Sequence, residues 1–361
     1  MSGGTGAQRI AGGGGLLRHR LLWPIVILLA LLLSNLLFSA SFFSLEMKDG
    51  HLYGSLIDIL RSGAPLIIVG IGMTLVIATG GIDLSVGAVI AISGAVAVSQ
   101  ISGLEDQSST GAVLTASAVA LGVAMVCGLW NGVLVAVLGI QPIIATLILM
   151  VGGRGLAQLV SDGQIVTVSS GPFRVIGAGY WLTLPVSILV AAAVLALTVL
   201  VSRRTAFGLL LESVGGNAEA SRLAGIRSRS LIVLAYVFSG LCAGIAGLMI
   251  SSNVSSADAN NMGLWYELDA ILAVVIGGTA LLGGRYFLAG TVVGALMIQT
   301  LTTTVYSIGI PPETTLLFKA LVVTLVFLLQ SAAFREKVFG RRRRRPPAPL
   351  APSPTSVPTP Q

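Results

Sequence analysis

The 361-residue chain has few charged residues, only three lysines and almost no histidine or cysteine. Charged residues make up 10% of it, hydrophobic residues make up 55%, and the mean hydropathy is +0.94. Lys48, Lys319 and Lys337 all lack the preceding glycines of a Walker phosphate-binding loop, which excludes ATP binding by such a loop. With His19 and His51 as the only histidines, a histidine metal cluster and a His-based catalytic triad are excluded as well. We therefore predict no catalytic residue, no metal site and no cofactor in this chain.

The two cysteines and the basic residues further limit the class of protein to which the chain can belong. Cys127 and Cys242 lie in separate apolar runs and define neither a disulfide framework nor a metal site. The net charge of +7 would suggest nucleic acid if the cations were spread out, but 15 of the 21 Lys and Arg fall before residue 21, within 203–229 or within 335–345. Basic clusters between apolar runs are typical of the cytoplasmic side of a membrane protein. We expect membrane lipid, and no nucleic acid, as a partner.

What the chain does contain is a series of apolar stretches. Ten of them are long enough, or nearly so, to cross a bilayer as helices: about 21–40, 62–79, 85–101, 111–138, 143–160, 182–201, 230–251, 268–281, 286–306 and 316–334. The first is longer than the apolar core of a signal peptide, which favours an uncleaved span. An even number places both basic termini in the cytoplasm and leaves only Lys48 and Arg174 in the definite outside loops. The sequence thus predicts an all-α multi-pass protein of the bacterial inner membrane.

The predicted topology divides the chain into three parts. Residues 1–20 form a flexible basic cytoplasmic tail, and residues 21–335 form the transmembrane domain with its cytoplasmic loop 203–229. Residues 336–361 combine five consecutive arginines with a proline-rich stretch, a composition typical of disorder, and form a second cytoplasmic tail.

The loop 203–229 carries five arginines and two acids between two apolar spans. Its middle predicts a short helix. Asn217 can cap the first free amides, Glu219 suits the positive end of the helix dipole, and Gly225 supplies a left-handed residue at the end. So short a helix needs a partner surface to be stable. The alternative is a solvated loop that merely satisfies the charge rule.

Polar residues at membrane depth are the candidates for a translocation path or gate. Each has a structural alternative. Asp83 lies in the glycine-rich break after the second span and could instead cap the next helix. Asn131 and Gln299 could instead bond a neighbouring helix. Glu267 and Asp269 could instead stabilise the first turn of their own helix through its dipole.

Two glycine-rich breaks, 78–88 and 276–285, lie in the two halves of the chain and are weakly similar in sequence. Interrupted helices in both halves of a transporter often mark its path. Both breaks fall nearer the inner face in the predicted topology, which suits gating or contact with a partner; glycine packing between helices is the competing explanation.

Several ordered motifs together carry a family resemblance. They are GMTLVIATGGIDLSVGAV (72–89), GLWNGVLVAVLGIQPIIATLILMVGGRG (128–155), ESVGGNAEASRLAGI (212–226) and ELDAILAVVIGGTALLGGR (267–285). Over about residues 20–335 the chain resembles the permease subunits of bacterial sugar ABC importers, the ribose, xylose and galactoside group. The runs 256–278 and 49–66 are most similar to the galactofuranose-uptake permeases.

The resemblance implies an ATP-driven importer of a monosaccharide, with this chain as a non-enzymatic permease of ABC importer fold. It implies three partners: an ATPase subunit that binds ATP and Mg, a periplasmic sugar-binding protein, and a second permease as a homodimer or a heterodimer. The 217–226 helix would be a coupling helix, since Glu219, Ala220, Ser221 and Gly225 are similar to the short EAA-type signature; the I-x-L-P of its long form is absent. The residues expected to couple to the ATPase are Glu212, Gly215, Asn217, Glu219, Ala220, Arg222 and Gly225. The alternatives are another solute of ABC permeases, such as an amino acid or autoinducer, or an ion-coupled secondary transporter, which usually buries paired carboxylates in mid-span.

Overall fold

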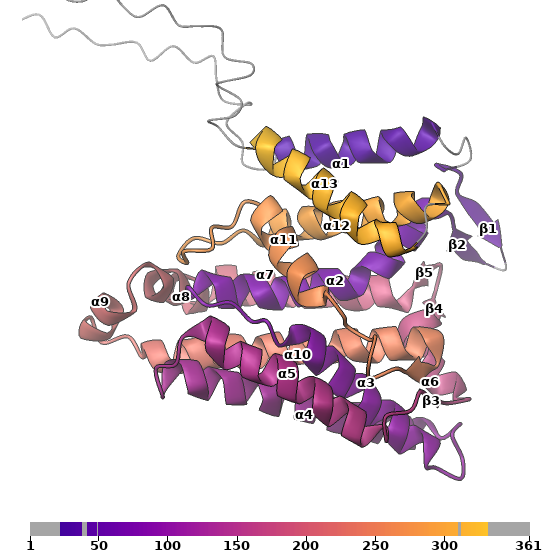
Figure 1. Ribbon diagram of the computed structural model, residues 1–361, viewed down its shortest axis with the longest axis horizontal. Coiled ribbons are helices and arrows are strands. Elements are labelled where there is room, and N and C mark those ends of the chain that lie inside the picture. Colours follow the sequence, from indigo (N-terminus) through magenta and orange to yellow (C-terminus); the bar gives the residue numbers. More distant parts are fainter. Residues whose placement is uncertain (1–21, 38–41, 49, 310–311, 331–361) are drawn as a thin grey trace, which may run out of the picture. The chain divides into compact units, whose positions relative to one another are not determined.

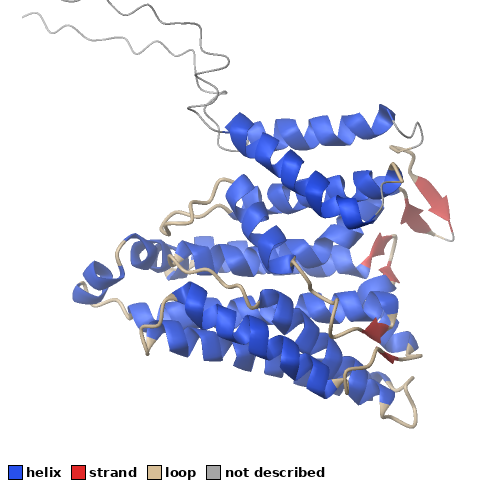
Figure 2. Ribbon diagram, in the orientation of Figure 1, coloured by secondary structure: helices blue, strands red, loops and turns tan. Residues whose placement is uncertain are grey.

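The chain is predominantly helical (Figures 1 and 2). The computed structural model describes residues 22–37, 42–48, 50–309 and 312–330. Its helices are α1 Leu22–Ser34, the 3-10 helix η2 Asn35–Leu37, α2 Ser55–Ala78, α3 Val86–Ser102, α4 Thr110–Ala136, α5 Pro142–Val160, α6 Gly171–Ala178, α7 Val186–Arg204, α8 Phe207–Gly216, α9 Ala218–Leu223, α10 Ser228–Val254, α11 Tyr266–Ile276, α12 Leu288–Ser307 and α13 Pro312–Gln330. The predicted tails, 1–20 and 336–361, lie outside the described residues.

Three small antiparallel sheets of two or three residues per strand accompany the helices and leave the chain in the predicted all-α class. They pair β1 Glu46–Lys48 with β2 His51–Tyr53, β3 Val166–Thr167 with β6 Ser256–Ala257, and β4 Tyr180–Trp181 with β5 Leu184–Pro185. Met47 lies opposite Leu52, Val166 opposite Ala257, and Tyr180 opposite Pro185. All three sheets lie at one end of the helices, here called the sheet end, and α9 lies at the other, here called the α9 end (Figure 2).

The chain divides into two units, Met1–Lys319 and Ala320–Gln361. The described part of the second unit is the rest of α13, up to Gln330. The architecture and sites below belong to the first unit.

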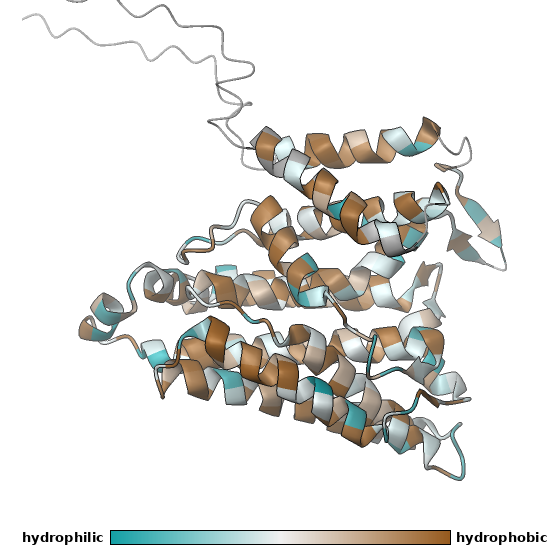
Figure 3. Ribbon diagram, in the orientation of Figure 1, coloured by the Kyte–Doolittle hydropathy of each residue, from teal (hydrophilic) through white to brown (hydrophobic). Residues whose placement is uncertain are grey.

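Most apolar stretches of the sequence correspond closely to helices, but the predicted span at about 268–281 corresponds only to α11, whose 11 residues are too few to cross a bilayer. Six described helices are long and apolar enough to cross a membrane, namely α2, α4, α5, α7, α10 and α12, and three shorter apolar segments are Leu22–Leu37, α3 and α8. Figure 3 shows the long helices as mostly hydrophobic, with hydrophilic residues on α9 and in connections. The expected second span was placed too late: α2 begins at Ser55, not near residue 62, because Asp58 and Arg61 are included in its first turns.

The burial of the helices separates the centre from the periphery. In α2, 83% of the most apolar window is buried, whereas in α7 only 17% is. A helix that is apolar all round and buried on every side lies in the protein core, while one with exposed apolar sides suits lipid. Helix α2 is therefore central, and α7 is peripheral.

Small residues allow the central helices to approach closely. A Cβ atom on Gly128 of α4 would lie 2.9 Å from Val237 Cα of α10, and one on Gly240 of α10 would lie 3.0 Å from Gly128 Cα. Such contacts leave no room for side chains, as in other membrane helix pairs joined through small residues. Helices α4 and α10 are therefore in direct backbone contact at these glycines.

Candidate functional site

Helix α9 is a short exposed helix with both ends capped, as its sequence predicts. The Asn217 side chain accepts a hydrogen bond from Ala220 N at 2.9 Å. At the other end Gly225 has φ +86°, its N–H donates to Arg222 O at 3.0 Å, and Ile226 N donates to Ser221 O at 3.0 Å. These two bonds form a Schellman motif, which requires the left-handed residue that glycine supplies. The caps satisfy backbone groups that a six-residue helix would otherwise leave free.

The outer surface of α9 combines an ion pair with an apolar residue. Arg222 pairs with Glu219 in a two-pronged contact, with Nη2 to Oε1 at 2.5 Å and Nε to Oε2 at 3.0 Å. The guanidinium holds the pKa of the Glu219 carboxyl below its usual value. Leu223 is 77% exposed, and Ala220 is exposed as well. An exposed, preformed helix with one large apolar side chain is suited to docking in a groove of another protein.

Helix α8, which precedes α9, was not predicted. The sequence predicts a polar loop with one helix over 203–229, whereas α8 occupies Phe207–Gly216 and buries Leu211 completely. Its apolar residues FGLLL are flanked by arginines, and that charge obscured them. Helix α8 ends at Gly216 and α9 begins at Ala218, so only Asn217 separates the two helices.

Helix α8 meets both glycine-rich breaks at a backbone junction, here called the glycine junction. A Cβ on Gly215 would overlap Ala78 O, at the end of α2, and would lie 2.5 Å from Gly284 N. A Cβ on Gly283, which has φ +85°, would lie 2.8 Å from both Gly215 O and Gly80 N. Gly284 N donates to Ala78 O at 2.9 Å. The two breaks, about 200 residues apart in sequence, are therefore in direct backbone contact with each other and with α8.

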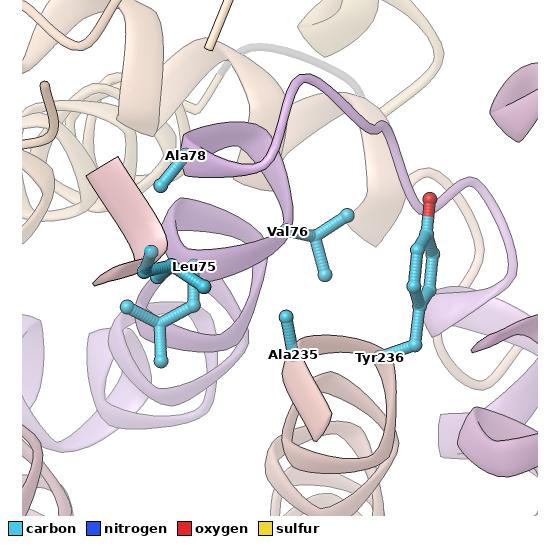
Figure 4. Packing of buried hydrophobic residues seen from close by; sticks show 6 residues of the cluster. Leu75, Val76, Ala78, Ala235 and Tyr236 are labelled. Carbon is cyan, nitrogen blue, oxygen red and sulfur yellow. The ribbon is translucent and has the colours of Figure 1, made fainter. Parts of the chain in front are cut away.

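An apolar cluster supports the glycine junction. It consists of buried residues from α2, α8 and α10, which are Leu75, Val76, Ala78, Leu211, Ala235 and Tyr236. Figure 4 shows the end of α2 beside α10, with Val76 lying between Ala78 and Tyr236. Phe207 and Tyr286 pack against the same cluster. Since close-packed interiors deform little, α8 and the end of α2 are expected to move together.

A buried polar network lies just beyond the junction, at Asp83. Its Oδ1 accepts hydrogen bonds from Ser85 N at 3.0 Å and Ser85 Oγ at 2.6 Å, and its Oδ2 accepts from Ser239 Oγ at 2.8 Å. Asn131 Nδ2 donates to Ser85 Oγ at 2.8 Å. Asp83, Ser85, Asn131 and Ser239 are all at most 1% exposed. The network thus joins the α2–α3 break to α4 and α10.

The structure separates the predicted path candidates. Asp83 and Asn131 share the buried network, while Glu267, 3% exposed, lies in the first turn of α11. Asp269 forms an ion pair with Lys319 at 2.8 Å. Only Gln299 lines the larger described cavity, at the sheet end. The role of these residues in a path or gate remains a prediction.

The predicted coupling residues also fall into two groups. Asn217, Glu219, Ala220, Arg222 and Gly225 form or end α9. Glu212 is half-buried on α8, and Gly215 lies in the glycine junction and not on an outer surface. Ser239, which completes the network, was not predicted, whereas Gly283 of the junction lies within the predicted break 276–285. A serine in an apolar span gives no signal until the fold brings its partner close.

Comparison with known proteins gives a consistent result. A family model described as "Branched-chain amino acid transport system / permease component" matches residues 55–327. The galactofuranose transporter permease protein of Escherichia coli (strain K12) is 49% identical over 91% of this chain and 96% of its own. The fructose import permease protein of Bifidobacterium longum (strain NCC 2705) is 38% identical over 91% and 93%. The ribose import permease protein of Haemophilus influenzae is 34% identical over 87% and 93%. No solved structure gives a significant match.

Proposed function

Because the chain belongs to the family of permease components of branched-chain amino acid transport systems, we propose that it is the membrane-spanning subunit of an ATP-driven importer of a monosaccharide. The family description names amino acids, but the three relatives reported above are named for galactofuranose, fructose and ribose. Each aligns with at least 87% of this chain. Within this set, 49% identity to the galactofuranose permease favours galactofuranose or a related sugar as the substrate.

The proposed complex has four kinds of component. This chain crosses the inner membrane with about ten helices and both termini in the cytoplasm. A second permease, identical or paralogous, completes the path, and a sugar-binding protein delivers substrate at the sheet end. A separate ATPase subunit binds ATP and Mg and docks on α9. The chain itself supplies the path and the coupling and has no catalytic role.

One observation carries the coupling mechanism: α9 is exposed and is connected through α8 to both glycine-rich breaks. When the ATPase closes on ATP, it displaces the docked α9. Helix α8 follows, and the glycine junction passes the displacement to the end of α2 and to the loop before α12. Since α2 is the central helix, this displacement reaches the region between the spans, where a substrate would pass. Alternating access needs such a connection between the ATPase and the path.

Reconstitution tests the proposal. The chain, its ATPase and its binding protein are placed in liposomes with ATP at the ATPase side, and uptake of radiolabelled galactose, fructose and ribose is measured. We expect uptake to require ATP and to survive collapse of proton and sodium gradients. Uptake that needs a gradient and ignores ATP would establish an ion-coupled transporter instead, and import of an amino acid without any sugar would reassign the substrate.

The α9 assignment has its own variant pair. Gly225→Val places a β-branched residue at φ +86°, a conformation that it adopts only with strain, whereas Gly225→Asn introduces a residue that tolerates this region. We expect the valine variant to insert normally but to lose ATPase binding in a pull-down and transport-linked ATP hydrolysis, and the asparagine variant to keep most of both. Equal activity of the two variants would contradict docking through this cap.

A further inference from the structure

A cavity lined by both polar and apolar residues lies at the sheet end of the first unit. Its volume is about 590 Å³, and it is lined by the first turns of α2, the last turns of α10 and α12, and residues from α6, α7 and α11. This volume falls within the range of sites for small molecules. The rim residues Asp58 and Asn253 are exposed, so the cavity is accessible from the sheet end.

The cavity is lined by a hydroxyl group and a carboxylate that have no hydrogen-bond partner among the described residues. The hydroxyl of Ser187, a residue 2% exposed, lines the cavity and has no hydrogen-bond partner among the described residues. The Asp58 carboxylate makes no ion pair or hydrogen bond with any described residue, although Arg61 lies one turn further along α2. Arg61 Nη2 donates instead to Asn253 Oδ1 at 2.7 Å, across the mouth. A buried hydroxyl without a partner costs free energy, which a bound polar ligand would recover.

The side of the cavity toward the α9 end is closed by tight packing. A Cβ on Gly63 of α2 would lie 3.3 Å from Gln299 Cβ of α12, and one on Gly70 would lie 2.9 Å from Thr291 Cγ2. Thr74 Oγ1 and Thr291 Oγ1 are 2.7 Å apart and buried. The cavity is therefore open toward the sheet end and closed on the other side by the close packing of α2 against α12.

We propose that this cavity is a reception site for a neutral polyhydroxylated sugar, an inference that rests on the proposed function. The lining balances one carboxylate against one guanidinium, which suits neither a free anion nor a free cation. Carboxylate, amide and hydroxyl groups offer both donors and acceptors, as sugar hydroxyls require. Pro65, Met249 and Ile250 supply an apolar wall for the C–H face of a sugar ring.

Ser187→Ala tests the site, with Ser117→Ala as a matched control. Both serines are buried, and both have hydroxyls without a partner among the described residues, but Ser117 lies on α4 and does not line the cavity. Removing an unpaired buried hydroxyl leaves stability unchanged or slightly raised, so neither variant is expected to unfold. In the reconstituted importer we expect Ser187→Ala to raise the KM for radiolabelled sugar about fivefold to tenfold, as for loss of one hydrogen bond. Asp58→Asn should raise KM further, and Ser117→Ala should leave uptake unchanged.

The outcomes separate the two proposals. Sugar uptake by the wild type with an unchanged KM in both Ser187→Ala and Asp58→Asn would show that the cavity holds only water, which overturns the reception site and leaves the proposed function standing. A KM rise shared equally by Ser117→Ala would also overturn the site, since that hydroxyl lies elsewhere. No sugar uptake by an intact wild-type importer would overturn the proposed function and the site with it.

Discussion

Gly215→Ala is the most direct test of the glycine junction. The added methyl group would overlap Ala78 O and approach Gly284 N to 2.5 Å. Both are backbone atoms, so no side chain can rotate away to make room. Helix α8 would have to separate from the end of α2, and the hydrogen bond from Gly284 N to Ala78 O at 2.9 Å would be weakened or lost.

The size of the effect follows from three contributions. Overpacking a close contact costs about 1–3 kcal/mol. Losing a buried backbone hydrogen bond costs about 1 kcal/mol, and replacing glycine by alanine in a helix returns about 0.5–1 kcal/mol. The net loss of unfolding free energy is about 1–3 kcal/mol. If coupling depends on the same contact, this corresponds to roughly a fivefold to 150-fold weaker link between ATP hydrolysis and uptake.

Two assays on the adjacent pair of variants check this reasoning. Thermal unfolding in detergent reports the stability loss, and sugar-stimulated ATP hydrolysis by the reconstituted importer reports coupling. The control is Gly216→Ala, whose Cβ would meet nothing within 4 Å and which should be neutral or slightly stabilising. If Gly215→Ala matched Gly216→Ala in both assays, the junction would not transmit motion and its tight geometry would be incorrect.

Three further predictions concern stability in detergent. Gly128→Ala should lower the unfolding free energy by about 1–3 kcal/mol because it separates α4 from α10, whereas Gly122→Ala, with nothing within 4 Å, should not; equal stability would contradict the close crossing. Asp83→Ala should cost about 2–4 kcal/mol because buried donors lose their acceptor, and Asp83→Asn should cost less; equal losses would show that the hydrogen bonds are not the cause. Lys319→Met should cost about 1–3 kcal/mol by leaving Asp269 unpaired in a largely buried site, and adding Asp269→Asn should restore much of it; an additive loss in the double variant would refute the pairing.

The spans were predictable because their signal is local. A helix in lipid must satisfy every backbone group within itself and present apolar side chains, so about 20 apolar residues are enough to identify it. The predicted stretch 143–160 is α5 Pro142–Val160, and 85–101 is α3 Val86–Ser102. The caps of α9 were predictable for the same reason, because Asn217 and Gly225 act on neighbours within a few residues.

The errors also have a physical cause. The first turns of α2 contain Asp58 and Arg61, whose charge lowers the local hydropathy to that of a loop. In the structure both residues belong to the helix and line the mouth of a cavity. Helix α8 was hidden because the whole helix is only ten residues long and lies in a segment rich in arginine. In the first turns of α2 and in α8, tertiary packing supplies stabilisation that cannot be recognised from the local sequence.

By itself, the sequence determined the class of protein, the order of the main apolar helices and the position of the exposed capped helix, since hydrophobicity, charge and capping act over one or two turns. Only the tertiary structure decided which polar residues belong together. It joined Asp83 to Ser239, paired Asp269 with Lys319, and brought Gly80, Gly215 and Gly283 into backbone contact. It also placed Ser187 and Gln299 around one cavity. These contacts join residues that are distant in sequence, and they form only when helices pack closely enough for backbone and small side chains to meet.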